Sequence, residues 1–415
     1  MVLSCTLIPK QAIENQVKVS VEQMNNKDLF YFVQEDNYQT IQDNYADCIL
    51  LNVIYHQNSQ HPFYSTLAGM YYKEDSLRID EALLESIHTQ TKANTHYSQY
   101  WHGTTIVLRP LLTIFTLQQI RMIFGGCIIL FMTFIGIYCV KNKLTMYYIC
   151  FILGYVLVQG WMSFYCIEYS VSMLVMTLML CLLCWLDKKK ILNKDISWYF
   201  VIAGIFTCFF DFLTTETIVC LLPCAFLVAV HQRDGQLHYG YWKKLLKYIC
   251  IFGLAYAMMF FFKWVLVCLF LGVDKFNEIL QQASLRVHGD IELGLFSSPS
   301  NSFIEKTTGA ILRNISCNIS FLHHATNGSS WLIIGIGFVL VSSVIYMIHT
   351  NIKKYHLLWL MLGILPLIRF VVLSNHSYLH FFFTYRALWS TITCILYFIW
   401  DSCIKDRIQW KKKFL

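Results

Sequence analysis

The sequence predicts an all-α, polytopic helical membrane protein with a long water-exposed region before its first span. Of its 415 residues, 56% are hydrophobic and only 14% are charged, whereas a soluble globular protein has roughly 25% charged residues. The apolar residues gather in blocks of about 17 to 24 residues, long enough to cross roughly 30 Å of hydrocarbon. A backbone in lipid must satisfy its own hydrogen bonds, so these blocks are expected to be helices.

In chain order, residues 1–117 contain no such block and are expected to form an extracytoplasmic region of amphipathic and interfacial helices, for example at 12–24, 41–56 and 81–88. Transmembrane helices follow at 118–271 and 331–400, separated by an extracytoplasmic loop at 272–330, and a basic cytoplasmic tail covers 401–415. About nine spans are predicted, at 118–140, 144–162, 169–187, 197–213, 216–231, 247–271, 331–349, 355–373 and 381–400.

The net charge of +7 reflects topology rather than a nucleic-acid partner. Lysines cluster in alternate loops, at 141–143, 188–194, 243–247 and 353–354, and in the tail at 411–413. The short loops of opposite parity, around 163–168, 213–217 and 374–380, contain no Lys or Arg. By the positive-inside rule, the N-terminal region is extracytoplasmic and the C-terminus is cytoplasmic in a multi-pass protein of the cell membrane.

The 16 cysteines fall mostly inside apolar stretches, where they act as small hydrophobic residues, and they predict no metal site. The sequence contains no Walker motif, GxGxxG, GxSxG or HExxH. ATP hydrolysis, dinucleotide redox chemistry and serine hydrolase chemistry therefore have no support.

Charged residues inside spans are costly and point to function. In the last hairpin, Arg369 precedes the loop 374–380 by five residues and Arg386 follows it by six, which places both roughly 8 Å below the same surface. His376 and His380 lie one helical turn apart above them. This arrangement suits a phosphate-bearing lipid headgroup, because arginine binds phosphate bidentately.

The alternative is that Arg369 and Arg386 neutralise Asp211 and Glu216 as structural ion pairs. Asp211 lies in CFFDFLTTET, at the tight turn between two spans. It either belongs to the site or pairs with a cation such as Lys263.

Two external segments carry further candidates. Asp43 and Asp47 stand at i, i+4, so on a helix both carboxylates share one face and could serve as a general base or cation site; the alternative is a solvated helix face. The stretch YSQYWHGTTIVLRPLL brings His102 and Arg109 to the membrane interface, where Arg109 either holds a lipid phosphate or extends to the headgroups.

The segments IQDNYAD, QYWHG followed by LRPLL, FFDFLT and NHSYLHFFFTYRAL resemble a family of uncharacterised membrane proteins of Gram-positive bacteria. More broadly, the order of features resembles the GT-C class of membrane glycosyltransferases. In the narrower family LIPKQAIENQV resembles the stretch just after a first transmembrane helix, which implies that this helix is missing from the present sequence.

The resemblance implies transfer of a sugar from a polyprenyl-phosphate donor to a cell-envelope glycan acceptor at the extracytoplasmic face. It makes Asp43 or Asp47 the base, gives donor-phosphate binding to the three arginines, and lines the site with the three histidines. No nucleotide or other cofactor is then required, and a divalent cation stays an open alternative. Two other functions compete: a transporter or flippase of a lipid-linked or charged solute, and a non-catalytic subunit of envelope assembly.

Overall fold

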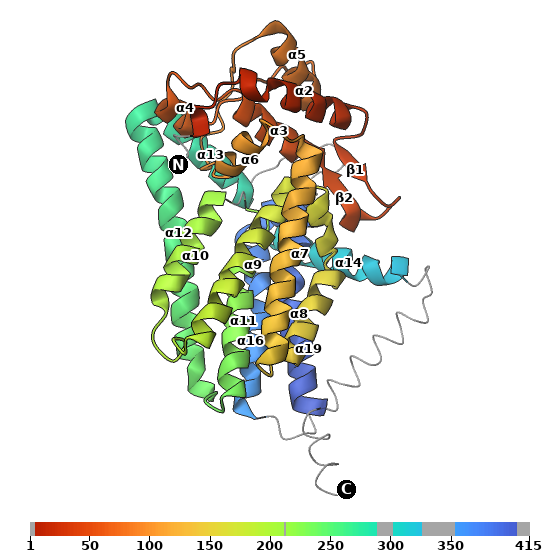
Figure 1. Cartoon of the computed structure of the whole chain (residues 1–415), viewed down its shortest axis with the longest axis vertical. Coiled ribbons are helices and arrows are strands. Elements are labelled where there is room, and N and C mark those ends of the chain that lie inside the picture. The colour runs from red at the N-terminus through yellow and green to blue at the C-terminus, as the bar shows by residue number, and fades with distance from the viewer. Residues whose placement is uncertain (1–4, 211–212, 289–301, 326–352, 405–415) are drawn as a thin grey trace, which may run out of the picture.

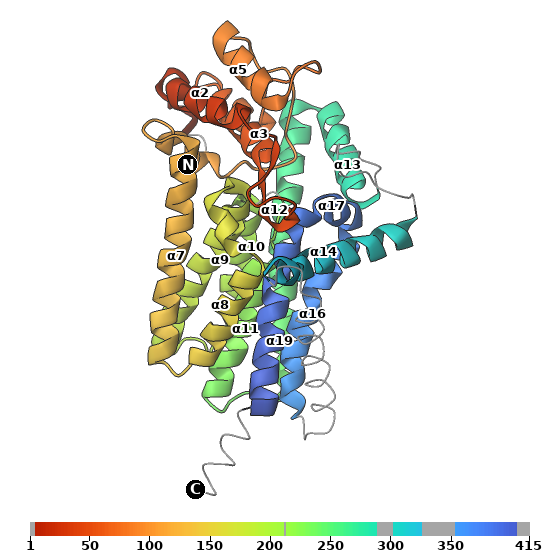
Figure 2. The same cartoon turned by 90° about the vertical axis from the view of Figure 1, so that its right-hand side faces the viewer.

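The computed structural model describes residues 5–210, 213–288, 302–325 and 353–404, and in these residues the protein is almost entirely helical (Figures 1 and 2). Five helices are long and apolar enough to cross a membrane: Leu117–Lys141, Ile167–Lys188, Tyr239–Leu271, Lys354–Val372 and Phe381–Ser402. Three shorter apolar helices are Thr145–Leu157, Ser197–Phe210 and Ile218–Arg233. The all-α class is therefore confirmed, and five helices of sufficient length and hydropathy support the membrane assignment. The number nine stays a prediction, because the span predicted at 331–349 lies outside the described residues.

The long helices form a bundle, and the N-terminal region sits on one end of it as a cap, here residues 5–116 (Figure 1). The bundle contains α7 (Leu117–Lys141), α8 (Thr145–Leu157), α9 (Ile167–Lys188), α10 (Ser197–Phe210), α11 (Ile218–Arg233), α12 (Trp242–Leu271), α16 (Leu357–Val372) and α19 (Leu388–Ile399). Helices α8 and α19 approach closely at Gly154, where an added Cβ would lie 2.6 Å from the Trp389 ring. The Trp389 indole N–H donates to the Phe151 carbonyl at 2.8 Å, which satisfies its one polar atom inside the core.

The cap contains α2 (Gln11–Asn25), α3 (Asn44–Tyr55), α4 (Pro62–Ala68), α5 (Ile79–Thr89) and α6 (Thr105–Leu111), with a hairpin of β1 (Phe30–Phe32) and β2 (Ile41–Asp43). Its apolar side chains pack with the first turns of α7 and α9 in one cluster. The helices predicted at 12–24 and 81–88 are confirmed. The helix predicted at 41–56 begins later, at Asn44, because residues 41–43 pair with β1.

Residues 259–264 of α12 connect the cap to the bundle through hydrogen bonds. The Lys263 ammonium is buried and donates to the Leu67 carbonyl at 2.7 Å, at the end of α4. Trp101 and Trp264 cross-link the same region, since Trp101 donates to the Met259 carbonyl at 3.0 Å and Trp264 to the Gln99 carbonyl at 3.3 Å. Lys263 is thus bound by the carbonyls of a helix end, where a cation is favourable.

The segment 272–330, expected to be a loop, forms helices in its described parts. After Gly272, α13 (Val273–His288) turns back beside the cap. Helix α14 (Phe303–Ala325) lies across the bundle, roughly perpendicular to the long helices (Figure 2). Helices α17 (Ser374–Leu379) and α18 (Phe381–Thr384) replace the short loop of the last hairpin and pack against α14.

Candidate functional site

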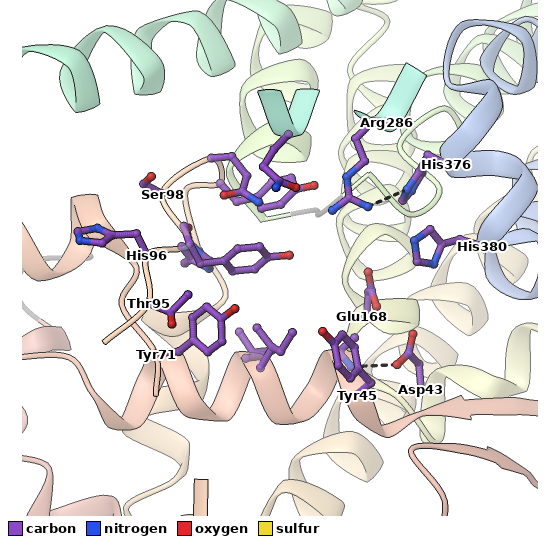
Figure 3. Close-up of a pocket in the computed structure, with 18 of the residues that line it drawn as sticks. Asp43, Tyr45, Tyr71, Thr95, His96, Ser98, Glu168, Arg286, His376 and His380 are labelled. Atoms are coloured by element: carbon purple, nitrogen blue, oxygen red, sulfur yellow. Dashed lines mark hydrogen bonds between the residues drawn. The ribbon is translucent and has the colours of Figure 1, made fainter. Parts of the chain in front are cut away.

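A cavity of about 540 Å³ lies between the cap and the ends of the bundle helices that are nearest to it. The cap supplies the residues around Asp43 and the segment 95–102, the bundle supplies Glu168 at the start of α9, and α13 and α17 supply Arg286 and His376. Figure 3 shows these groups from distant parts of the sequence facing one space. A volume of this size lies within the ~300–1,000 Å³ of small-molecule sites.

Asp43 places a carboxyl group of shifted acidity in the cavity. It ends β2 and caps α3, because its Oδ1 accepts the Ala46 N–H at 2.9 Å. Burial disfavours the charged form and raises the pKa of Asp43 to about 7; the cap bond opposes this shift, and the nearby Asp47 charge reinforces it. A carboxyl group that is half-ionised near neutral pH can both take up and release a proton.

Asp47 also borders the cavity, but its carboxylate is held by structural partners. Arg121 on α7 contacts it at 2.7 Å, and both side chains are almost completely buried. The Ile167 N–H, which begins α9, donates to Asp47 at 3.0 Å. Asp47 therefore joins α3, α7 and α9 and caps the start of α9. The spacing of Asp43 and Asp47 in the sequence does not distinguish their roles.

Arg286 and His376 form a hydrogen-bonded pair at the same end of the cavity (Figure 3). The arginine has only donors, so the Nδ1 of His376 accepts from Arg286 Nη1 at 3.3 Å, and its Nε2–H donates to the Leu213 carbonyl at 2.9 Å. This bonding requires the neutral ring. Burial, followed by the charges nearby, lowers the pKa of His376 well below its usual value, in agreement with this tautomer.

His380 packs against His376, with ring centroids 4.6 Å apart and ring planes tilted by 48°, and lines the cavity beside it. Burial and the charges of Arg286 and Arg369 lower the pKa of His380 to about 3. Its Nδ1 is buried with no hydrogen-bond partner among the described residues. A buried polar atom of this kind is costly unless water or a ligand reaches it.

His102 lines the cavity from the segment that closes the cap. Its Nε2–H donates to the Tyr97 carbonyl at 2.6 Å, and burial lowers its pKa to about 3. The ring fits against Gly69, where an added Cβ would lie 2.6 Å from Nε2. His102 is thus a neutral residue that fixes the shape of this wall.

The three arginines predicted to hold phosphate do not line the cavity. Arg109 is fully buried and donates to the carbonyls of Ile8, Ile54 and Gln57. These contacts join parts of the cap to one another.

Arg369 forms a buried ion pair with Glu216 at 2.8 Å, which is the structural alternative stated for it. Arg386 donates to the carbonyls of Phe382 and Gln39 and packs over the Tyr169 ring. These side chains hold the end of the bundle together beneath the cavity. Asp211 lies outside the described residues, so its pairing with Lys263 stays a prediction.

The described residues hold no group of three or more His, Cys, Asp or Glu side chains arranged to bind a metal ion. Comparison of the chain with protein-family models, curated proteins and solved structures found no match. The described lining of the cavity offers a carboxyl group with a pKa near neutral, one arginine, and three neutral histidines, His102, His376 and His380.

Sequence reasoning missed Arg286 and Glu168 as cavity residues. Arg286 was missed because α13 was taken for a loop, although its apolar residues recur every three or four positions, at 273, 276, 280, 283 and 287. That spacing is typical of an amphipathic helix and was the available signal.

Proposed function

We propose that this protein is a membrane glycosyltransferase that transfers a sugar from a polyprenyl-phosphate donor to a cell-envelope acceptor on the extracytoplasmic side. The observation that carries the proposal is the cavity between cap and bundle, which brings Asp43 with its raised pKa to the same space as Arg286. Such a cavity, at the level where the bundle ends, suits a substrate whose lipid tail stays in the bilayer.

In the proposed reaction, Asp43 takes the proton from an acceptor hydroxyl as its oxygen attacks the anomeric carbon of the donor sugar. The new C–O bond forms while the bond between that carbon and the phosphate oxygen breaks. The polyprenyl phosphate leaves with the electron pair. Arg286 stabilises the negative charge on the leaving phosphate, and His380 contributes a hydrogen bond to it.

The neutral state of the two histidines supports this assignment of the arginine. A second cation beside Arg286 would repel it, whereas the neutral His376 accepts a hydrogen bond from it and fixes its direction. Arg286 is also the one Lys or Arg among the described residues that line the cavity. In this proposal Arg286 binds the donor phosphate, in place of Arg109, Arg369 and Arg386, to which the sequence prediction assigned it.

The charge distribution supports the extracytoplasmic placement. Helix α7 runs from the cap to Lys141, and α9 runs in the same direction to Lys188, so their basic ends lie at the end of the bundle away from the cavity (Figure 1). By the positive-inside rule that end is cytoplasmic. The cavity then faces the outside, where lipid-linked sugars serve as donors without nucleotides.

The test is turnover of a panel of polyprenyl-phosphate monosaccharides by the full chain in nanodiscs, measured as release of polyprenyl phosphate. Asp43→Asn and Arg286→Gln should each lower the rate by about 100-fold or more, the usual effect of losing a general base or an anion-stabilising group. Asp28→Asn and Lys92→Gln remove exposed charges of the same signs and should leave the rate unchanged. Equal rates in all four variants would reject the enzyme and favour a transporter or a non-catalytic subunit.

A further inference from the structure

The cavity has two chemically different ends (Figure 3). Asp43, Glu168, Arg286, His376 and His380 gather at one side, which we term the charged end. The opposite side carries Tyr71, Thr95, His96 and Ser98, which bear aromatic rings and uncharged hydroxyls. The proposed reaction uses only the charged end, so the second end needs a role of its own.

Two tyrosines form the wall of this second end. The rings of Tyr71 and Tyr97 meet edge to face with centroids 6.0 Å apart, and Tyr100 supports Tyr97 from behind at 5.4 Å. Tyr71 and Tyr97 are half-buried, so part of each ring remains open to the cavity. We use the term tyrosine wall for Tyr71 and Tyr97.

The tyrosine wall is held rigidly by its own backbone. Tyr71 and Thr95 exchange two backbone hydrogen bonds of 3.0 Å, and the Tyr97 carbonyl is fixed by His102. The wall is therefore formed before any ligand binds, and a ligand would pay little to order it. A partly exposed aromatic wall inside a cavity is a typical surface for the apolar C–H face of a sugar ring.

The polar groups around the wall match sugar hydroxyls. Thr95 and Ser98 carry hydroxyls, and Gln281 and Gln282 of α13 carry amides, all lining the same cavity. The Thr95 hydroxyl donates to Asn94 Oδ1 at 2.9 Å and keeps its acceptor capacity, while Ser98 and the two amides can both donate and accept. A hydroxyl-rich ligand requires such groups and a hydrocarbon chain does not. This combination favours a saccharide over a lipid tail at this end.

Charge distinguishes a neutral sugar from an acidic one. Glu278 lines the cavity, and its partner Lys275 lies 2.6 Å away in an exposed pair. The cavity's single arginine would be occupied by the donor phosphate. An acidic sugar would therefore face the carboxylates of the cavity with no further Lys or Arg among the described lining residues to pair with it.

We infer that the tyrosine wall is the acceptor subsite and binds a neutral saccharide, with the hydroxyl to be glycosylated directed toward Asp43. This inference rests on the proposed function for the meaning of "acceptor", but binding of a saccharide at the wall can be measured without any reaction. The two ends then have different roles: the charged end binds the donor phosphate, and the tyrosine wall selects the acceptor saccharide to which the donor sugar is transferred.

The experiment is saturation-transfer NMR of the full chain in nanodiscs with a panel of neutral disaccharides and the matched disaccharides that end in a uronic acid. At least one neutral disaccharide should bind, and more tightly than its uronic acid counterpart. Tyr71→Ala should weaken that binding by roughly tenfold or more, the usual loss on removing an aromatic anchor. Tyr71→Phe, which keeps the ring, should retain most of it.

Tyr64→Ala is the matched control, because Tyr64 is a tyrosine of the cap that is 45% exposed and does not line the cavity. It should leave saccharide binding unchanged. Unfolding temperatures of all variants, compared with the parent, show that a loss of binding comes from the wall rather than from misfolding.

Binding of polyprenyl phosphate is measured in parallel with Arg286→Gln, so that the two proposals fail separately. If that lipid binds through Arg286 but no disaccharide binds, or the uronic acids bind best, the inference about the wall is rejected alone. If the lipid is indifferent to Arg286→Gln while neutral disaccharides bind through Tyr71, the glycosyltransferase proposal is rejected and the saccharide site stands.

Discussion

Asp43→Asn should make the protein more stable while it abolishes transfer. The parent buries a carboxyl group that must ionise to act as a base, and burial opposes that ionisation. Asparagine is nearly isosteric, remains neutral, and its amide oxygen can still accept the Ala46 N–H that begins α3. The variant therefore removes the charge and little else.

The magnitude follows from the shift in pKa. The pKa of Asp43 rises from 3.8 to about 7 on folding, a change of about three units, and each unit corresponds to ~1.4 kcal/mol. Because the folded state favours the protonated form, the associated stability is fully present below pH 3.8 and is lost as pH rises through about 7. Above that range the ionised parent should be about 4 kcal/mol less stable than the variant.

The assay is thermal unfolding in nanodiscs, followed by tryptophan fluorescence at about pH 4 and about pH 9. The variant and parent should unfold together at the lower pH and separate at the higher pH, with the variant more stable. Asp28→Asn, which removes an exposed carboxylate, should follow the parent at both. A variant no more stable than the parent at the higher pH would refute the conclusion that burial raises the pKa of Asp43 and makes its ionisation costly. In the parent, the transfer rate should also rise as pH increases through about 7, and a rate independent of pH there would contradict the assignment.

Three further changes test the framework around the cavity. Asp47→Asn leaves the buried Arg121 without its carboxylate and should cost ~3–5 kcal/mol, seen as a lower unfolding temperature that Arg121→Met partly restores in the double variant. Lys263→Met removes the clamp on Leu67 and should cost ~1–3 kcal/mol, with faster protease cleavage of the cap; unchanged cleavage would contradict the clamp. Glu216→Gln leaves the buried guanidinium opposite it unpaired and should lower the unfolding temperature more than Asp28→Asn does, and equal effects would count against a structural pair.

The sequence predicts the helices well where composition or periodicity alone decides them. The apolar blocks of the bundle and the amphipathic helices of the cap are properties of local stretches, so they could be recognised without knowing the neighbours. The hairpin of β1 and β2 was missed because three residues per strand give no periodic signal. Helix α13 was missed because its segment is polar on average, although its apolar residues keep a helical spacing.

The site could be predicted only in part, because its residues are distinguished by contacts that are distant in the chain. Asp43 and Asp47 have equal standing at i, i+4, and the partner that separates them is Arg121, 74 residues after Asp47. Its distance from the loop 374–380 correctly predicts that Arg369 lies at the end of the bundle nearest the cap. That distance does not reveal that Glu216 neutralises the Arg369 side chain.

The charged groups in and beneath the cavity fall into two sets, according to whether a buried residue of opposite charge pairs with them. Asp47 and Arg369 are each neutralised by a buried partner of opposite charge, and such pairs join helices but leave little capacity for a ligand. Asp43 and Arg286 instead face the cavity, where the described partners of their charged groups are a backbone N–H and a neutral histidine. A negative and a positive group kept available in one enclosed space are costly to maintain in an empty protein. A ligand that supplies both a proton to accept and an anion to bind would offset this cost, and the proposed hydroxyl acceptor with its phosphate-linked donor supplies both at once.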